Sequence, residues 1–168
     1  MKKIFYLLLI AITIITACKP KTESVSVDIK AEKDSIAKNL DKMYSAFTAK
    51  DAKTFLPFLT DDCLYCGTDS KEFWDKESYS KFFNEMSADT LYKAPTLTLN
   101  KREIRLDKSG TSAIAVDQLF VSGWTEKVPL RNVTHLLKID NKWMCDFVSM
   151  SLVPHNEDLE KIFHAVKE

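Results

Sequence analysis

The chain has 168 residues, with 24 basic and 24 acidic side chains and 45% hydrophobic residues. This length suits one domain with its own hydrophobic core, and the balanced charge, without a basic stripe, argues against nucleic acid as a partner. The chain has three glycines, which leave little room for a glycine-rich phosphate loop, and three histidines without metal-ligand spacing. We therefore expect neither a metal site nor another cofactor.

The N-terminal segment has the layout of a secretory signal peptide. Lys2 and Lys3 precede an uncharged apolar run, residues 4–15, which is too short to be a good membrane span. The run ends in Ile-Thr-Ala-Cys, which resembles the bacterial lipobox. The resemblance implies that residues 1–17 are a lipoprotein signal peptide and that Cys18 is lipidated as the first residue of the mature chain. The alternatives are an ordinary secretory signal and an anchor helix with a chance cysteine.

A lipid on Cys18 would tether the protein to a membrane of the bacterial cell envelope. Lys19 rather than an aspartate follows Cys18, and by resemblance to the sorting rules of such lipoproteins this favours the periplasmic face of the outer membrane. Residues 18–29 are polar and charged and are predicted to be a tether. Residues 30–168 then form a single domain.

Three helices are predicted in the first half of this domain. The first carries an apolar stripe at helical spacing, a short second one begins at Asp51 and is weakened by Pro57, and the third follows the capping residue Asp75. The stripe of the first helix consists of Ile36, Leu40, Met43, Tyr44 and Phe47. A C-terminal helix is predicted after Pro154 and Asn156, and we expect its apolar side to pack on its own domain.

Strand patterns follow the third helix, in residues 96–106, 112–124, 127–139 and 142–153. In the first of these segments the apolar alternation slips by one residue, which predicts a β-bulge between Asn100 and Glu103. Helices followed by an antiparallel meander predict an α+β domain.

Cys63 and Cys66 are separated by two residues, and the alternatives are a redox pair, a metal site and a plain strand. In a strand, residues three apart face opposite sides, so the two thiols could neither chelate one metal ion nor form an unstrained disulfide. With Cys18 lipidated, Cys145 makes the number of remaining thiols odd. Buried, unreactive thiols are therefore favoured over a redox or metal site.

Two motifs and the order of the elements resemble a known family. The segment after Cys66 reads Gly-Thr-Asp, then an acid, then tryptophan, and the last predicted strand begins with tryptophan. The matching residues are Gly67, Thr68, Asp69, Glu72, Trp74, Trp143 and Ser151. This pattern resembles the SnoaL-like branch of the nuclear transport factor 2-like superfamily, and the resemblance covers nearly the whole domain.

The resemblance implies a strongly curved antiparallel sheet around N-terminal helices, a cone-like roll of the cystatin type with an inner pocket. Many members of the superfamily are dimers, so a homodimer is one expectation. Members include isomerases, cyclases, dehydratases and many binding proteins without catalysis. Phe147 and Ser149 stand where many members carry two histidines, which argues against chemistry that needs those imidazoles.

Asp117 interrupts an otherwise apolar strand and lies near Arg131 or Asn132 if the next hairpin turns at residues 123–125. It is either the general base of an isomerase or cyclase, or an outward-facing residue or structural ion pair. Tyr44 is either a pocket hydroxyl or an aromatic side chain at the edge of the core. The predicted pocket consists of Tyr44, Asp117, Arg131, Asn132, Thr134, Phe147, Ser149 and Ser151. We expect a membrane-tethered domain that binds a small apolar ligand or a protein partner without catalysis, and base catalysis by Asp117 is the alternative.

Overall fold

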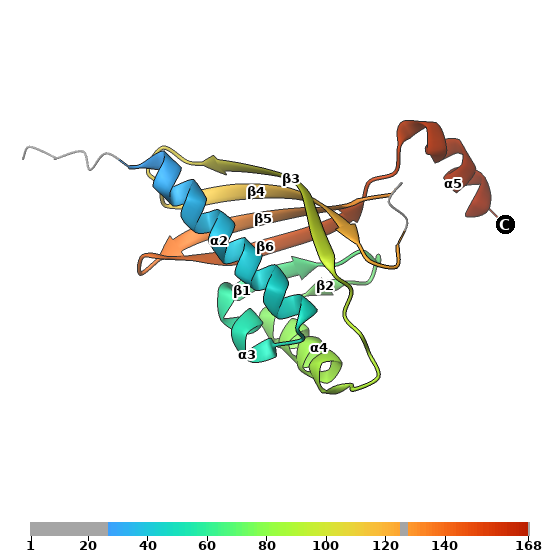
Figure 1. The fold of residues 1–168 in the computed structure, drawn as a ribbon, viewed down its shortest axis with the longest axis horizontal. Coiled ribbons are helices and arrows are strands. Elements are labelled where there is room, and N and C mark those ends of the chain that lie inside the picture. Colours follow the sequence, from blue (N-terminus) through green and yellow to red (C-terminus); the bar gives the residue numbers. More distant parts are fainter. Residues whose placement is uncertain (1–26, 125–127, 168) are drawn as a thin grey trace, which may run out of the picture.

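The computed structural model describes residues 27–124 and 128–167 (Figure 1). The predictions for the signal peptide and for Cys18 lie outside these residues, as does most of the predicted tether. Within the described ranges, no helix is long and apolar enough to cross a membrane.

Three helices open the domain, as predicted. They are α2 (Ile29–Thr48), α3 (Ala52–Phe55), which continues as the 3₁₀ turn η1 (Leu56–Phe58), and α4 (Lys76–Ala88). Each α-helix begins after an aspartate, Asp28, Asp51 or Asp75, whose carboxylate accepts a hydrogen bond from a backbone amide of the first turn. Pro57 lies in the 3₁₀ turn, where the α-helix has already ended.

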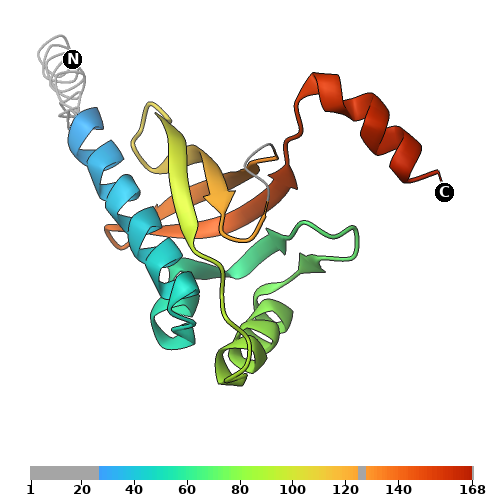
Figure 2. The same cartoon turned by 45° about the vertical axis from the view of Figure 1, so that its right-hand side comes forward.

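A six-stranded sheet curves around α2 (Figure 2). Its strands are β1 (Leu59–Cys66), β2 (Phe73–Trp74), β3 (Leu97–Leu106), β4 (Ser112–Val121), β5 (Leu130–Ile139) and β6 (Lys142–Leu152). They are arranged in the order β2-β1-β6-β5-β4-β3. β3 to β6 form the predicted antiparallel meander, whereas β1 pairs with β6 in parallel, so the sheet is mixed. The predicted α+β class with a curved sheet is confirmed.

The main hydrophobic core lies between the inner face of the sheet and the three helices. α2 contributes Ile36, Leu40, Met43 and Ala46 at helical spacing. α3 and α4 add aromatic rings, and the rings of Phe55 and Phe83 stack with their centroids 4.6 Å apart. Because each large side chain contributes about 1.5–3 kcal/mol when it is buried, this core holds the helices inside the curve of the sheet.

Two β-bulges decide which residues face the core. In β3 the register shifts between Leu99 and Lys101, which confirms the predicted bulge and turns Arg102 toward the helices, directly opposite Asp117 of β4. In β6 the pairing with β5 skips Asp146, and the sequence did not predict this second bulge. A bulge reverses the alternation, so different residues of β6 face inward before and after it.

The predicted C-terminal helix is present as α5 (Leu159–Ala165), preceded by the 3₁₀ turn η2 (Asn156–Asp158). The prediction that it packs on its own domain is wrong. The side chains of Ile162 and Phe163 remain 37% and 58% exposed. An extended segment at residues 153–155 carries the chain away from the sheet before the helix begins, and α5 therefore stands apart from the core (Figure 2).

Candidate functional site

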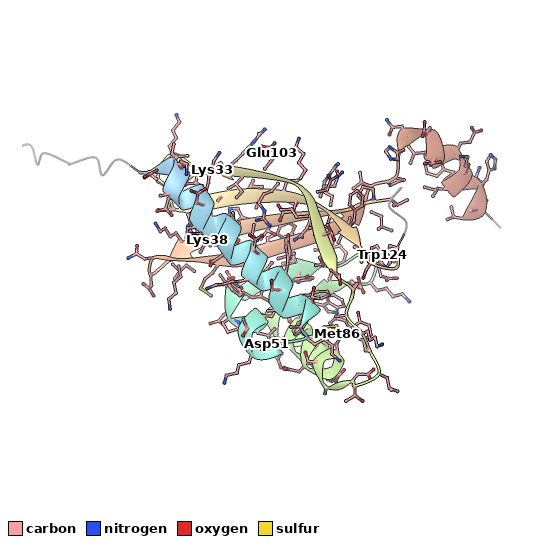
Figure 3. The ribbon with its side chains drawn as sticks, in the orientation of Figure 1. Lys33, Lys38, Asp51, Met86, Glu103 and Trp124 are labelled. Atoms are coloured by element: carbon pink, nitrogen blue, oxygen red, sulfur yellow. The ribbon has the colours of Figure 1, made fainter. Side chains whose placement is uncertain are left out.

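A cavity of about 200 Å³ lies between α2, α4 and the inner face of the sheet. Figure 3 labels two residues of its wall, Met86 on α4 and Trp124 just after β4. The wall consists of Met43, Tyr44, Phe47, Phe55, Tyr65, Thr68, Glu72, Trp74, Tyr79, Phe82, Met86, Tyr92, Pro95, Leu97, Leu119, Val121, Trp124, Leu130, Asn132 and Met150. Most of these side chains are aromatic or aliphatic, so the cavity suits an apolar molecule.

Three aromatic residues of the described wall are exposed to solvent. Phe82, Tyr92 and Trp124 are 41%, 40% and 46% exposed, and we call these three residues the rim. Deeper in the cavity, the rings of Tyr65 and Tyr79 stack with their centroids 3.8 Å apart and are almost fully buried. The cavity therefore has an aromatic entrance and an aromatic interior.

A chain of hydrogen bonds, which we call the polar relay, runs behind the cavity through Arg102, Asp117, Tyr44 and Asn132. Arg102 donates from Nε to Asp117 Oδ1 and from Nη2 to Asp117 Oδ2, both at 2.8 Å. The Tyr44 hydroxyl donates to Asp117 Oδ2 at 2.7 Å and accepts from Asn132 Nδ2 at 2.9 Å. Both carboxylate oxygens of Asp117 are thus occupied by neighbours.

The polar relay also attaches α2 to the sheet. Arg102 Nη1 donates to the carbonyl oxygen of Ala37 at 3.1 Å and to Asp41 Oδ1 at 2.8 Å, and both acceptors belong to α2. Tyr44, one turn further along the same helix, adds its hydroxyl. Because Asp117 is 1% exposed, its negative charge is stabilised by this bidentate guanidinium rather than by water.

Burial and charge keep Tyr44 and Arg102 in their ordinary protonation states. Burial, followed by the negative charge of Asp117, raises the pKa of Tyr44 well above its usual value, so the phenol stays neutral. Burial opposes the charged form of Arg102, but the hydrogen bonds and charges of Asp117 and Asp41 outweigh it and raise the pKa of the guanidinium. The polar relay is therefore a fixed array at neutral pH.

The family motif forms one wall of the cavity. Glu72 folds back over Gly67, and its Oε2 accepts a hydrogen bond from the amide of Asp69 at 2.9 Å. A Cβ at Gly67 would lie 2.0 Å from Glu72 Oε2, so any other residue there would displace the Glu72 side chain from this position. Thr68 and Glu72 both line the cavity, a role that the sequence did not predict for them.

The structure places the predicted pocket residues in different positions relative to the cavity. Tyr44 and Asn132 line the cavity, and Asn132 pairs directly with Asp117 across β4 and β5. Asp117 lies behind Tyr44 in the structural ion pair that was one of its predicted alternatives, although its partner is Arg102. Thr134 is buried behind Asn132, whose Nδ2 lies 3.4 Å from Thr134 Oγ1.

Like Asp117 and Thr134, the other four predicted pocket residues are not in the cavity wall. Asn132 faces inward, so the residue before it in β5, Arg131, points to the outer face of the sheet. Arg131 is exposed there and donates a hydrogen bond to Gln118. Phe147, Ser149 and Ser151 are displaced by the bulge at Asp146: Val148 and Met150 face inward in their place. Trp143, before the bulge, faces inward and is 3% exposed.

The three described cysteines are free and buried, as predicted. Cys63 and Tyr65 are two residues apart in β1, and both are buried in the core. Cys66 directly follows Tyr65 and therefore points to the opposite side of the strand. Burial raises the pKa of the Cys63 thiol to about 12 and also raises the pKa of Cys145 and Cys66. These thiols are poor nucleophiles and poor metal ligands. In the described part of the chain, no three acidic, histidine or cysteine side chains are grouped as metal ligands would be.

A family model described as a SnoaL-like domain matches residues 36–154. The chain belongs to the SnoaL-like family. The match runs from the buried stripe of α2 to the end of β6, so the cavity and the polar relay both lie inside the SnoaL-like domain. α5 lies beyond it. No curated protein matches the chain.

Solved structures with the same fold come from several bacteria. A domain of unknown function with a cystatin-like fold from Nostoc punctiforme is 15% identical, with a TM-score of 0.65, and the match covers 82% of this chain and 87% of that one. An uncharacterised protein with a cystatin-like fold from Caulobacter vibrioides is 14% identical, with a TM-score of 0.64 and coverage of 78% and 95%. A nuclear transport factor 2-like protein of unknown function from Shewanella baltica is 16% identical, with a TM-score of 0.59 and coverage of 77% and 99%. At these identities the similarity shows the fold alone.

Proposed function

We propose that the SnoaL-like domain binds a small, mostly apolar ligand in the cavity and performs no chemistry on it. The proposal rests on the mostly apolar and aromatic wall of the cavity, combined with the Asp117 carboxylate, both of whose oxygens already accept hydrogen bonds from Arg102 or Tyr44. A volume of about 200 Å³ lies below the roughly 300–1,000 Å³ of drug-sized sites. It exceeds the roughly 150 Å³ of an apolar cavity that holds benzene, so a ligand of one or two rings fits.

The geometry favours binding over base catalysis by Asp117. A general base must come within hydrogen-bond reach of the proton that it removes. Asp117 is 1% exposed and does not belong to the cavity wall, and both of its oxygens already accept hydrogen bonds from Arg102 and Tyr44. A substrate would therefore meet Tyr44 before it met the carboxylate. The expected protein partner would use another surface, the exposed apolar side of α5.

We also propose that a lipid on Cys18 holds the domain at the periplasmic face of the outer membrane. The support is the Ile-Thr-Ala-Cys ending of the apolar run and the lysine that follows it. Residues 19–28 separate Cys18 from α2, and ten residues reach at most about 35 Å when extended. Cys18→Ser should abolish the incorporation of labelled palmitate, while Cys66→Ser should leave it intact. Equal labelling of the Cys18→Ser variant and the wild type would reject the anchor.

The binding proposal is tested by the molecules that the protein retains. The full chain is purified from its native membrane and its small-molecule content is compared by mass spectrometry with that of Met86→Trp. This substitution fills the cavity from α4, whereas Phe73→Trp adds the same ring at a side chain that is 68% exposed and outside the wall. We expect an apolar compound with the wild type and with Phe73→Trp and much less of it with Met86→Trp. Equal amounts with all three proteins would contradict the proposal.

A further inference from the structure

We infer that the ligand of this cavity is an amine: a small apolar body with a cationic nitrogen that binds Glu72. This inference rests on the proposed binding function and specifies the chemical class of its ligand. The first observation is the charge of the wall. Within the described residues, Glu72 is the charged side chain of the cavity lining, and no lysine, arginine or histidine accompanies it.

Glu72 has a carboxylate that its own domain uses only in part. Oε2 accepts the hydrogen bond from the Asp69 amide, and among the described residues no cation pairs with the group. The side chain is half-buried at the edge of an apolar cavity, where an opposite charge is screened less than in open solvent. A carboxylate in this position attracts a cationic donor and repels an anion.

The aromatic side chains of the wall favour the same kind of ligand. The face of an aromatic ring carries negative potential, and it attracts an ammonium group within about 6 Å of the ring centroid. Trp74 shares the wall with Glu72, and the rim adds Trp124 and Tyr92. A cavity wall with both aromatic rings and a carboxylate can therefore bind the cationic nitrogen of an amine and also its apolar body.

The polar relay fixes the polarity of the part of the wall formed by Tyr44 and Asn132. Arg102 keeps the Asp117 carboxylate as an acceptor, so the single proton of the Tyr44 hydroxyl must point to Asp117. The oxygen of Tyr44 therefore needs a donor, and the atom of Asn132 that faces it must be Nδ2. This leaves Asn132 Oδ1 as a buried acceptor without a partner in the described structure.

Neither Tyr44 nor Asn132 then offers a free proton to a ligand. The proton of the Tyr44 hydroxyl is used by Asp117, and Asn132 Nδ2 donates to Tyr44 and Thr134, so a ligand carbonyl or carboxylate would find no free donor on these two side chains. A ligand that brings only acceptors to this part of the wall would leave them unpaired, which costs binding free energy. The carboxylate of Glu72 and the lack of a free proton on Tyr44 and Asn132 therefore both disfavour an anionic or carbonyl ligand, and the carboxylate favours an amine.

Three probes with one phenyl ring test the inference: phenethylamine, its neutral isostere n-propylbenzene, and 3-phenylpropionate. The full chain is placed in nanodiscs of phosphatidylcholine, and binding is measured by equilibrium dialysis against empty nanodiscs. We expect phenethylamine to bind about tenfold more tightly than n-propylbenzene, and 3-phenylpropionate to bind more weakly than either.

Glu72→Gln assigns the effect to the carboxylate, because glutamine keeps an oxygen for the Asp69 amide and removes only the charge. It should abolish the advantage of phenethylamine and leave the affinity for n-propylbenzene unchanged, which also shows that the cavity is intact. Glu103→Gln is the matched control: Glu103 is an exposed acid of β3, outside the cavity wall, and is labelled in Figure 3. This control should behave as the wild type.

The outcomes separate this inference from the binding proposal. If n-propylbenzene binds and phenethylamine binds no better, the cavity is a binding site but its ligand is not an amine, and the inference is overturned. The same conclusion follows if Glu72→Gln keeps the full advantage of the amine. If none of the three probes binds, the proposed binding function fails and the inference falls with it.

Discussion

Replacing Arg102 with methionine should destabilise the domain far more than a surface substitution would. Methionine keeps much of the aliphatic length of the side chain but removes the guanidinium that binds both oxygens of Asp117. Among the described residues, the Asp117 carboxylate would then keep only the Tyr44 hydroxyl as a side-chain hydrogen-bond partner, while Asp117 remains 1% exposed. A buried charge that loses its partner keeps its desolvation cost and loses the interaction that offset it.

The magnitude follows from the burial of the pair. The side chains of Arg102 and Asp117 are 11% and 1% exposed, so solvent screening reduces their interaction little. Breaking such a pair from one side costs about 3–5 kcal/mol, a large part of the roughly 5–15 kcal/mol by which a domain is stable. Arg102 also bonds Ala37 and Asp41 of α2, so the loss should reach the upper part of this range. The double variant Arg102→Met/Asp117→Leu removes both charges and should recover most of the loss.

Urea denaturation followed by circular dichroism measures these free energies of unfolding. Lys101→Met is the control: Lys101 is the neighbour of Arg102 on β3, its side chain is 69% exposed, and its pairing with Glu103 at 3.6 Å is on the surface. The control should lie within about 0.5 kcal/mol of the wild type. A loss below about 1 kcal/mol for Arg102→Met, or a double variant no more stable than the single one, would refute the reasoning.

Three further predictions concern other parts of the chain. Hydrogen bonds from Lys138 and Trp143 lower the pKa of Glu32 in the folded protein below its ordinary 4.5. The ionised Glu32 therefore stabilises the fold above about pH 4.5, and this contribution is lost as the pH falls through the lowered pKa. The stability gap between the wild type and Glu32→Gln, measured by urea denaturation, should therefore narrow on acidification, and a gap independent of pH would contradict this. Cys63 and Cys145 should resist alkylation until urea unfolds the chain, as peptide mapping would show; rapid modification of the native protein would mean that they are accessible. Deleting residues 156–168 should leave the melting temperature nearly unchanged, because α5 buries almost nothing, and a clear decrease would show that α5 packs on a surface in solution.

The sequence alone indicated the features that depend on neighbouring residues. The caps at Asp51 and Asp75 and the stripe of α2 were predicted because capping and helical spacing involve residues within a few positions of each other. The bulge of β3 was visible because its apolar residues change phase within one strand. The motif from Gly67 to Trp74 indicated the family.

Other features depend on contacts that the sequence does not display. β1 pairs in parallel with β6, which lies about eighty residues further along the chain, and no local pattern encodes that choice. The bulge at Asp146 interrupts a segment in which residues of both faces are partly apolar, so alternation did not reveal it. This one shift exchanged Phe147, Ser149 and Ser151 for Val148 and Met150 on the inner face.

The candidate site shows the same division. Asp117 was predicted to lie near Arg131 or Asn132 because these residues belong to one hairpin, and the observed register pairs it with Asn132. Arg102 was missed, since a basic residue in an alternating strand is expected to face solvent until the bulge turns it toward Asp117. Glu72 was identified as a motif residue, and only the folding of its loop against α4 and β1 makes it part of a cavity. Local periodicity thus determined the elements, whereas strand register and loop packing, which join residues far apart in the chain, determined which side chains meet.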